Sequence, residues 1–190
     1  AAAMGKDVVN EFREARSLMG LSPQELNFDV FFSIRQLLIL QAGYYGLSKD
    51  RGASRADLML ERFGLTEKAN NTARELSGGM KRRVQIAKAL VHDPPIIILD
   101  EPTAGVDIEL RHMLWDYLRE LNAKGKTILL TTHYIEEAEA LCDRVAIIDQ
   151  GKIVTEGSPQ ELISTLGTGS IEIKIHDIPA ELNLEPWSFS

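Results

Sequence analysis

Short apolar runs alternate with amphipathic segments in the second half of this chain. Continuous apolar runs occur at residues 96–99, 127–131 and 145–149, and each has the length of a strand. Residues 107–123 and 135–141 lie between these runs and have the mixed apolar and polar pattern of amphipathic helices. Continuous apolar strands that alternate with such helices are typical of a parallel sheet covered on both faces. The pattern therefore predicts an α/β fold.

The first half of the chain is patterned mainly for helices. We expect a short strand at residues 16–21, then helices at residues 30–46 and at about 53–63. Ser77 is a good N-cap for a further helix over residues 79–91, which a pair of prolines then stops. The sequence thus predicts a group of helices ahead of the main strands.

Smaller elements are expected after the third apolar run. Gln150-Gly151 predicts a turn into a short apolar segment at residues 152–154. Ser158-Pro159 opens a short helix, and residues 170–175 alternate apolar and polar side chains like an edge strand.

Length, charge and cysteine content exclude several classes of protein. The 190 residues suffice for one domain, or for one domain and part of another. A net charge of −7 argues against a nucleic-acid binder with a basic face, and the single Cys142 excludes an internal disulfide framework. The most apolar stretch, residues 30–46, contains Arg35, Gln36 and Gln41 and is too short to span a bilayer. We therefore expect a soluble globular protein.

Two segments carry groups suited to nucleotide chemistry. The run at residues 96–99 ends in the adjacent carboxylates Asp100 and Glu101, a pair that suits Mg²⁺ and a nucleophilic water. The pair Gly78-Gly79 opens a basic helix, where free N–H groups and the helix dipole favour phosphate. Each signal has a structural alternative: an acidic pair can be solvated and inert, and a histidine after a strand, such as His133, is more often structural.

The combined motifs resemble those of the ATP-binding-cassette (ABC) family of ATPases, over about residues 16–165. The resemblance is carried by LSGGMKRR at residues 76–83, by DEPTAGVD at residues 100–107, and by TTHYIEEAE at residues 131–139 followed by LCDRV. This set is most similar to the ATP-binding subunits of ABC-2-type exporters, although Met80 stands where glutamine is commoner. The resemblance implies a P-loop NTPase core with a parallel sheet and a helical signature subdomain.

The resemblance also implies roles for individual residues. Asp100 and Gln24 would hold Mg²⁺, partly through water, and Glu101 would be the general base. His133 matches the switch histidine near the γ-phosphate of ATP. Gln24 belongs to the Q-loop, which contacts the membrane partner, Ser77 opens the signature loop, and Asp107 closes the D-loop. The implied ATP-binding set is Gln24, Ser77, Gly78, Gly79, Asp100 and Asp107.

One motif of the family is not found in the sequence. A phosphate-binding loop needs a glycine, four residues and then Gly-Lys followed by Ser or Thr. The single Gly-Lys-Thr, at residues 125–127, has Glu120 in place of the first glycine and leads from a helix into a strand. We therefore expect the chain to be the C-terminal part of a nucleotide-binding domain, with its N-terminal β-subdomain and P-loop missing, and to be inactive by itself.

The family pattern divides the chain into four segments. Residues 1–23 are expected to be a tag or linker remnant and the end of an N-terminal core. Residues 24–92 form a helical subdomain with the Q-loop and the signature helix, and residues 93–165 form a RecA-like core with the Walker B strand, D-loop and H-loop. Residues 166–190 begin a C-terminal extension.

Charged runs are expected to be solvated. Residues 81–83, Lys-Arg-Arg, are expected on the solvated side of the signature helix, with one arginine at the nucleotide interface as an alternative. Glu136, Glu137 and Glu139 are expected on the exposed face of the helix after His133.

The leading hypothesis is the ATP-hydrolysing subunit of an exporter, with ATP and Mg²⁺ as cofactors. The resemblance implies two partners, a transmembrane permease subunit and a second nucleotide-binding domain in a homodimer, and no nucleic acid. It also implies a cytoplasmic protein, peripheral on the inner face of the cell membrane. The alternatives are a soluble ABC ATPase that acts on the ribosome or DNA, and an interaction module that does not hydrolyse ATP.

Overall fold

The computed structural model describes residues 1–29 and 31–166, in two compact units that divide the chain between Cys142 and Asp143. The elements of the first unit are β1 (Ala2–Ala3), β2 (Lys6–Asp7), α1 (Phe12–Ser17), β3 (Met19–Ser22), α2 (Ile34–Tyr44), α3 (Lys49–Arg62), the 3₁₀ turns η1 (Thr66–Lys68) and η2 (Ala73–Glu75), α4 (Gly78–Leu90), β4 (Ile96–Asp100), α5 (Ile108–Ala123), β5 (Thr127–Thr131) and α6 (Ile135–Leu141). The second unit contains β6 (Val145–Asp149), β7 (Lys152–Gly157) and α7 (Pro159–Leu166).

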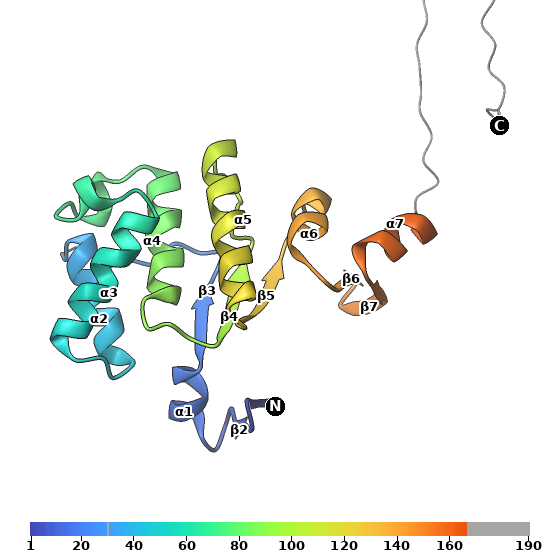
Figure 1. The fold of residues 1–190 in the computed structure, drawn as a ribbon, viewed down its shortest axis with the longest axis horizontal. Helices are drawn as coiled ribbons and strands as arrows, with labels where there is room; N and C mark the ends of the chain where they lie inside the picture. The colour runs from blue at the N-terminus through green and yellow to red at the C-terminus, as the bar shows by residue number, and fades with distance from the viewer. Residues whose placement is uncertain (30, 167–190) are drawn as a thin grey trace, which may run out of the picture. The chain divides into compact units, whose positions relative to one another are not determined.

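A three-stranded parallel sheet in the order β3-β4-β5 forms the centre of the first unit (Figure 1). The expected strand at residues 127–131 is confirmed, and the expected strand at residues 96–99 continues to Asp100. Ile97 and Leu99 on β4 are fully buried and belong to the same hydrophobic core as apolar side chains of α4 and α5. In register, Asp100 lies opposite Thr131, so the carboxyl ends of these two strands meet at one edge.

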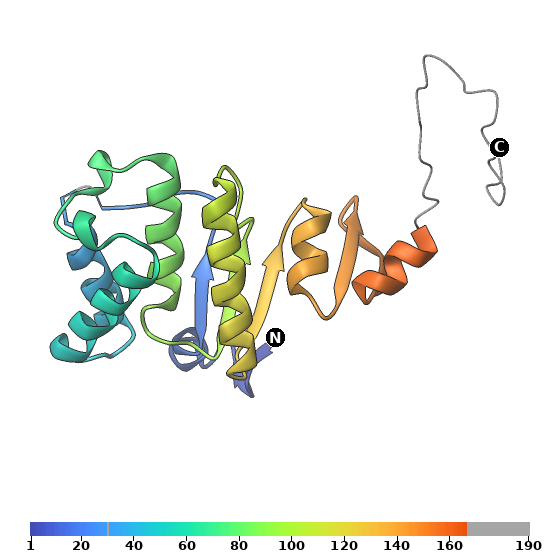
Figure 2. The ribbon, with the colours of Figure 1, turned by 45° about the horizontal axis from the view of Figure 1, so that its top comes forward.

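Helices α2, α3 and α4 form a group beside the sheet, and α4 contacts both β3 and the other two helices (Figure 2). Ile34, Leu38, Met59 and Phe63 from α2 and the end of α3 join the same hydrophobic core as the sheet residues. The helix expected from residue 30 begins at Ile34, because Ser33 and Gln36 form a capping box that fixes the start.

Gly20 sets how closely α4 can approach the sheet. A Cβ atom at this position would lie 2.1 Å from the carbonyl oxygen of Ala89 on α4 and 2.8 Å from a side-chain atom of Pro94. Both contacts are far inside van der Waals distance, so the observed packing of β3 on α4 requires glycine here.

The other face of the sheet is open in part. Leu21 of β3 and Leu129 of β5, which flank Ile98 in register, are 58% and 60% exposed. The expectation of a sheet covered on both faces is therefore wrong for these positions of the first unit. An open apolar face of this kind favours association with another molecule.

The second unit is an antiparallel hairpin followed by a helix. Strands β6 and β7 pair antiparallel across the expected turn at Gln150-Gly151, where both residues have positive φ. The expectation that the apolar run at residues 145–149 belongs to the parallel sheet is wrong, because among the described residues β6 pairs with β7 alone. The helix α7 starts at Pro159, as Ser158-Pro159 predicts, and contacts β7. The edge strand expected at residues 170–175 lies outside the described residues.

The N-terminal segment differs from its expected structure. Arg16 and Ser17, expected in a strand, close α1, and β3 starts only at Met19. Ala2 and Ala3, expected to belong to a tag or linker remnant, form β1, which pairs with β2. Within α1, Ala15 is completely buried, and the helix extends through Arg16 to Ser17.

Candidate active site

Two carboxylates lie at the end of the central strand, as the sequence predicts. The Thr131 hydroxyl donates to Asp100 Oδ1, and the Glu101 N–H donates to the Thr131 carbonyl at 3.1 Å and hydroxyl at 3.2 Å. Glu101 has φ +45°, a left-handed conformation that costs a residue with a Cβ roughly 1–3 kcal/mol. Strained backbone of this kind is found at sites where a side chain must point in a fixed direction.

His133 lies against the second carboxylate. Its Nδ1 is 3.0 Å from Glu101 Oε1, and its ring contacts the ring of Tyr134 at a centroid distance of 4.0 Å. His133 follows β5 and Glu101 follows β4, so the parallel pairing of these neighbouring strands brings the two side chains together. Asp100, Glu101, Thr131 and His133 therefore form one polar cluster, which we call the carboxylate site.

Arg82 is a candidate functional residue that the sequence does not single out. Expected on the solvated side of its helix, it is only 5% exposed, and its guanidinium donates to the carbonyls of Asp100 and Glu101. Burial lowers the pKa of Arg82, and the charges of Asp100 and Glu101 oppose this shift. A run of three basic residues gives no signal for this, because the acceptors lie on a distant strand.

The Q-loop residue Gln24 reaches the carboxylate site through its main chain. The carbonyl oxygens of Pro23 and Gln24 accept hydrogen bonds from Arg82 Nη1 at 2.9 and 3.1 Å. The Gln24 side chain is exposed. The structure thus brings the backbone carbonyls of Gln24, Asp100 and Glu101 to one guanidinium.

The signature residues open the 13-residue helix α4. The Ser77 side chain accepts from the Met80 N–H at 3.3 Å, which confirms it as the N-cap. Ser77 and Gly78 are exposed, and a Cβ at Gly78 or Gly79 would meet no atom within 4 Å. Within the part of the chain that the structure describes, no hydrogen bond or ion pair joins these residues to Glu101 or His133. The first N–H groups of a helix have no partner within the helix, so this uncrowded start of α4 is suited to an anion.

Asp107 caps the next helix. Its Oδ1 accepts the N–H of Leu110 at 2.9 Å, at the start of α5. Gly105, two residues earlier, has φ +69°, so the D-loop turns sharply between the carboxylate site and α5. This contact gives Asp107 a structural role whatever else it binds.

Glu137 differs from its expected position. It is fully buried, and the indole N–H of Trp115 donates to its Oε1 at 3.0 Å. The bond joins α6, which follows His133, to α5. Glu136 and Glu139 are exposed, as expected.

The donor set at Asp100 fits Mg²⁺. With one oxygen held by Thr131, the second oxygen of this partly exposed carboxylate is left for a cation. Mg²⁺ typically uses one or two protein carboxylates and takes its other ligands from water and phosphate. Among residues 1–29 and 31–166, no group of three or more His, Cys, Asp or Glu side chains is arranged to hold a metal ion.

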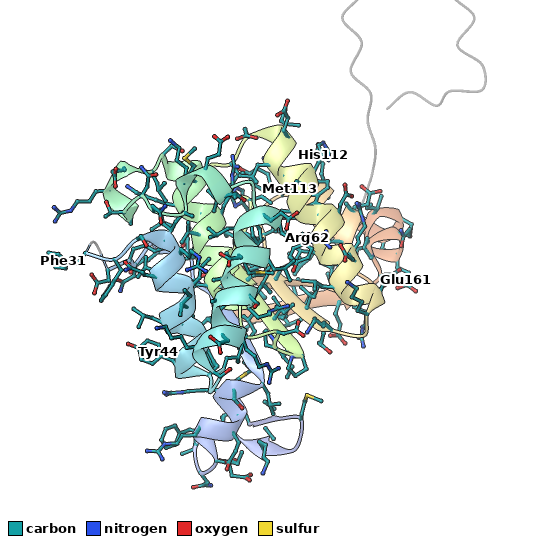
Figure 3. The ribbon with its side chains drawn as sticks, turned by 60° about the vertical axis from the view of Figure 1, so that its left-hand side comes forward. Phe31, Tyr44, Arg62, His112, Met113 and Glu161 are labelled. Atoms are coloured by element: carbon teal, nitrogen blue, oxygen red, sulfur yellow. The ribbon has the colours of Figure 1, made fainter. Side chains whose placement is uncertain are left out.

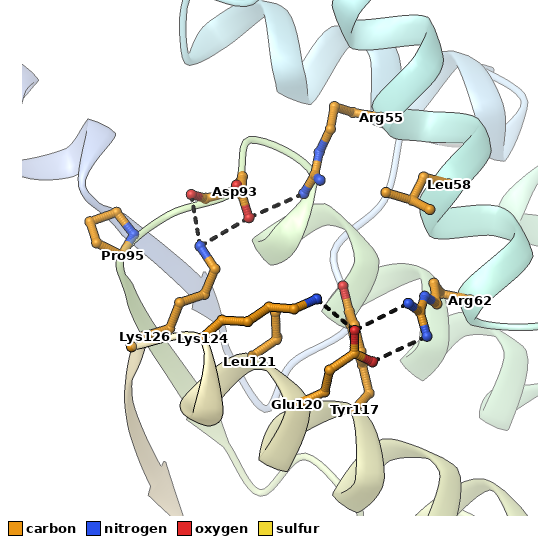
Figure 4. Close-up of a pocket in the computed structure, with 11 residues that line it drawn as sticks. Arg55, Leu58, Arg62, Asp93, Pro95, Tyr117, Glu120, Leu121, Lys124 and Lys126 are labelled. Atoms are coloured by element: carbon orange, nitrogen blue, oxygen red, sulfur yellow. Dashed lines mark hydrogen bonds and ion pairs between the residues drawn. The ribbon is translucent and has the colours of Figure 1, made fainter.

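A cavity of about 450 Å³ lies apart from the carboxylate site, between α3 and the end of α5 (Figure 4). Its charges are already paired: Arg55 and Lys126 contact Asp93 at 3.5 and 2.9 Å. A second acid, Glu120, is bound on the α5 side by Arg62 and Lys124. Lys126 and Arg55 hold the pKa of Asp93 below its usual value, although burial opposes them. Around this cavity, ion pairs join α3 to α5 and to the loop before β4. The charged groups named here are therefore already partnered within the protein.

A sequence model of the ABC transporter family matches residues 2–104 of the chain, which include the signature helix and both carboxylates. The chain belongs to this family. The match starts inside the segment expected to be a tag or linker remnant. In the described residues, no helix has the length and apolar character needed to cross a membrane.

Named relatives and solved structures agree with this assignment. The chain is 45% identical over 187 residues to "Nod factor export ATP-binding protein I" of Burkholderia orbicola, covering 98% of this chain and 61% of the relative. It is 41% identical over 177 residues to the protein of the same name from Ralstonia nicotianae, covering 93% and 55%. The chain thus spans about three-fifths of the length of these curated relatives.

Two solved structures share the fold. An ATP-binding subunit of an ABC transporter superposes with a TM-score of 0.79 at 28% identity, covering 87% of this chain and 69% of that chain. An ATP-binding cassette described as a dimeric post-hydrolysis state bound to ADP and Pi gives a TM-score of 0.73 at 28% identity, covering 80% and 68%. The predicted fold class, an ABC ATPase α/β core with a helical subdomain, is confirmed.

Proposed function

We propose that this chain is the larger part of the ATP-hydrolysing subunit of an ABC exporter. The observation that carries the proposal is the carboxylate site, in which Glu101 and His133 lie 3.0 Å apart next to Asp100. Adjacent carboxylates at the end of a buried strand, with a histidine on the next strand, suit the binding of Mg²⁺ and the activation of water.

In the proposed reaction, each side chain acts on one part of the substrate. Asp100 would hold Mg²⁺, with Gln24 partly through water, and the ion would supply positive charge for the phosphates of ATP. Glu101 accepts a proton from the attacking water. His133, held against Glu101, orients that water and the γ-phosphate.

The N-terminus of α4 is proposed to bind ATP held by a second copy of the subunit. Ser77, Gly78 and Gly79 form the start of α4, where a Cβ at either glycine would meet no atom within 4 Å, and Asp107 lies at the end of the D-loop. In this arrangement two subunits enclose two ATP molecules head to tail. The description of one solved relative as a dimer bound to ADP and Pi supports such an assembly.

The proposed membrane partner is a permease that docks on the helical group. Phe31, three residues before α2, and Tyr44, its last residue, are 84% and 83% exposed, and Figure 3 shows both side chains pointing away from the helices. Large exposed aromatic side chains favour contact with a protein partner. The subunit would then be peripheral on the cytoplasmic face of the membrane. The relatives' names favour export over action on the ribosome or DNA.

The proposal is tested by ATP hydrolysis in the full-length protein assembled with its permease. We expect Asp100→Asn to reduce Mg²⁺-dependent turnover roughly 100-fold or more, because the cation loses its carboxylate ligand. Asp116→Asn, at an exposed residue of α5 paired with Arg119, is the matched control and should leave turnover unchanged. Equal turnover in the two variants would contradict the proposal.

A further inference from the structure

All the donors of the Arg82 guanidinium are used within the first unit. Nη1 donates to the carbonyls of Pro23 and Gln24, and Nε donates to that of Pro102 at 3.3 Å. Nη2 donates to the carbonyls of Asp100 and Glu101. A guanidinium has five N–H donors, and here each one has a backbone acceptor. The side chain therefore binds two loops that are far apart in the sequence.

The same face of α4 holds the rest of the Q-loop. Gln85, three residues after Arg82, donates through Nε2 to the carbonyls of Pro23 and Glu25 at 3.1 and 2.7 Å. Lys88, three residues further, donates to the Asn27 carbonyl at 3.4 Å and lies over the Phe28 ring at 5.4 Å. Residues spaced by three or four lie on one side of a helix. The Q-loop main chain is thus held along one face of α4, from Pro23 to Phe28.

Arg82 is the member of this face that also holds Glu101. Glu101 itself has a strained backbone conformation, with φ +45°. The Glu101 N–H is fixed by Thr131, and its carbonyl is fixed by Arg82. With both ends of the residue held, the direction of its Cα–Cβ bond is fixed, and from there the carboxylate reaches His133 Nδ1 at 3.0 Å.

We propose that Arg82 is a positioning residue for ATP hydrolysis, which aims Glu101 by holding its carbonyl and couples that aim to the Q-loop through Pro23 and Gln24. The inference rests on the proposed function, since it names a residue that acts through the proposed general base. Arg82 touches neither ATP nor water in this account. Its effect belongs to the hydrolysis step and leaves ATP binding intact.

The test is chemical rescue in the full-length protein. Arg82→Ala should lower kcat roughly 10- to 100-fold, the range expected when a reacting group is displaced by about 1 Å, with the KM for ATP within about twofold. Added guanidinium ion, at millimolar concentrations far below denaturing ones, should bind in the vacated space and restore part of kcat. Arg82→Lys keeps the charge but has three donors, so it should recover only part of the activity.

Arg55→Ala is the matched control. Arg55 also donates to backbone carbonyls, those of Leu90 and Val91, and contacts Asp93, but it lies at the cavity away from the carboxylate site. It should lower the melting temperature and leave kcat unchanged, with or without guanidinium.

Two results would overturn the inference: a kcat for Arg82→Ala within about twofold of the unmodified protein, or a loss that guanidinium does not restore in a protein that melts like Arg55→Ala. If Arg82→Ala does not fold, Arg82→Lys decides, and full activity in that variant counts against the proposal. An unmodified protein without ATPase activity would instead refute the proposed function.

Discussion

His92 is a titratable residue whose pKa folding shifts strongly. Its ring stacks on Tyr45 with centroids 3.6 Å apart, and its Nε2 lies 3.1 Å from the Met19 carbonyl, which assigns the proton to Nε2. Burial, together with the charges of Arg55 and Lys126, lowers the pKa of His92 from 6.5 to about 4, although the Met19 carbonyl and Asp93 oppose this shift. The folded protein therefore holds this ring neutral.

This shift predicts that the chain loses stability in mild acid. Between pH 6.5 and pH 4 the unfolded chain binds a proton at His92 that the folded chain does not, so the free energy of unfolding falls as pH falls through this range. Above pH 6.5 His92 is neutral in both the folded and the unfolded chain, so its full contribution to the free energy of unfolding is present. We expect a loss of about 1 kcal/mol between pH 7 and pH 5, a figure reduced for the partial exposure of the ring.

The measurement is urea unfolding of the 190-residue chain as a function of pH. His92→Phe keeps an aromatic ring against Tyr45 and should flatten the slope in this window, although it loses the bond to Met19. His112→Phe, at an exposed ring, is the control for the loss of an imidazole. Identical slopes for the chain and for His92→Phe would refute the assignment.

His133 is the second residue at which a single change should be decisive. His133→Ala in the full-length protein should reduce ATP turnover roughly 100-fold or more, because Glu101 loses its neighbour and the γ-phosphate loses its orienting group. Steady-state ATPase assays check this. Tyr134→Phe, which keeps the adjacent ring and removes only a hydroxyl, should retain most of the turnover. Near-normal turnover in His133→Ala would assign this histidine a purely structural role.

At the scale of elements, the contact between β3 and α4 depends on one glycine. Gly20→Ala should destabilise the chain by about 3 kcal/mol, because the added Cβ collides with the Ala89 carbonyl and the backbone there must move. Gly43→Ala provides the opposite case: Gly43 lies in α2, an added Cβ there would meet no atom within 4 Å, and the change should stabilise by about 0.5–1 kcal/mol. Chemical unfolding of both variants measures the difference. A Gly20→Ala variant as stable as the unmodified chain would mean that this packing is wrong.

The sequence predicts elements well where they follow local periodicity. Residues 127–131, 135–141 and 145–149 have the expected bounds, because each is an unbroken apolar or amphipathic run with a turn on either side. The strand expected at residues 16–21 begins only at Met19, because Arg16 and Ser17 belong to α1, in which Ala15 is buried. Periodicity alone does not show that packing.

The residues of the carboxylate site could be predicted from the sequence, but the buried charged residues that support them could not. Asp100, Glu101 and His133 follow apolar strands, and neighbouring parallel strands bring their ends together, so motif and topology agree. Arg82 and Glu137 belong to charged runs that normally face solvent, and both are buried. Their partners, the carbonyls of two remote loops and the Trp115 indole, are set by tertiary contacts that a single sequence does not display.

At the scale of the whole molecule, the open sheet face should make the 190-residue chain self-associate. Leu21 and Leu129 present an apolar surface beside the edges of a short sheet, and such surfaces and unpaired edges promote association. Light scattering should therefore give a mass well above 21.2 kDa without nucleotide. Leu129→Lys should lower this mass, and Ile135→Lys, at an exposed residue of α6, should not. A monodisperse monomer without either change would refute the prediction.

Hydrolysis of ATP by Glu101→Gln in the full-length protein tests whether Glu101 is the general base. The amide keeps the size and hydrogen bonds of the side chain but cannot accept the proton of the attacking water. We expect ATP to bind with affinity within about threefold of normal, a nucleotide-dependent dimer to persist, and single-turnover hydrolysis to slow roughly 100-fold or more. Glu109→Gln, at an exposed residue in the first turn of α5, should behave like the unmodified protein. Hydrolysis by Glu101→Gln within about twofold of that control would contradict the central claim that Glu101 is the general base of an ABC-type ATPase.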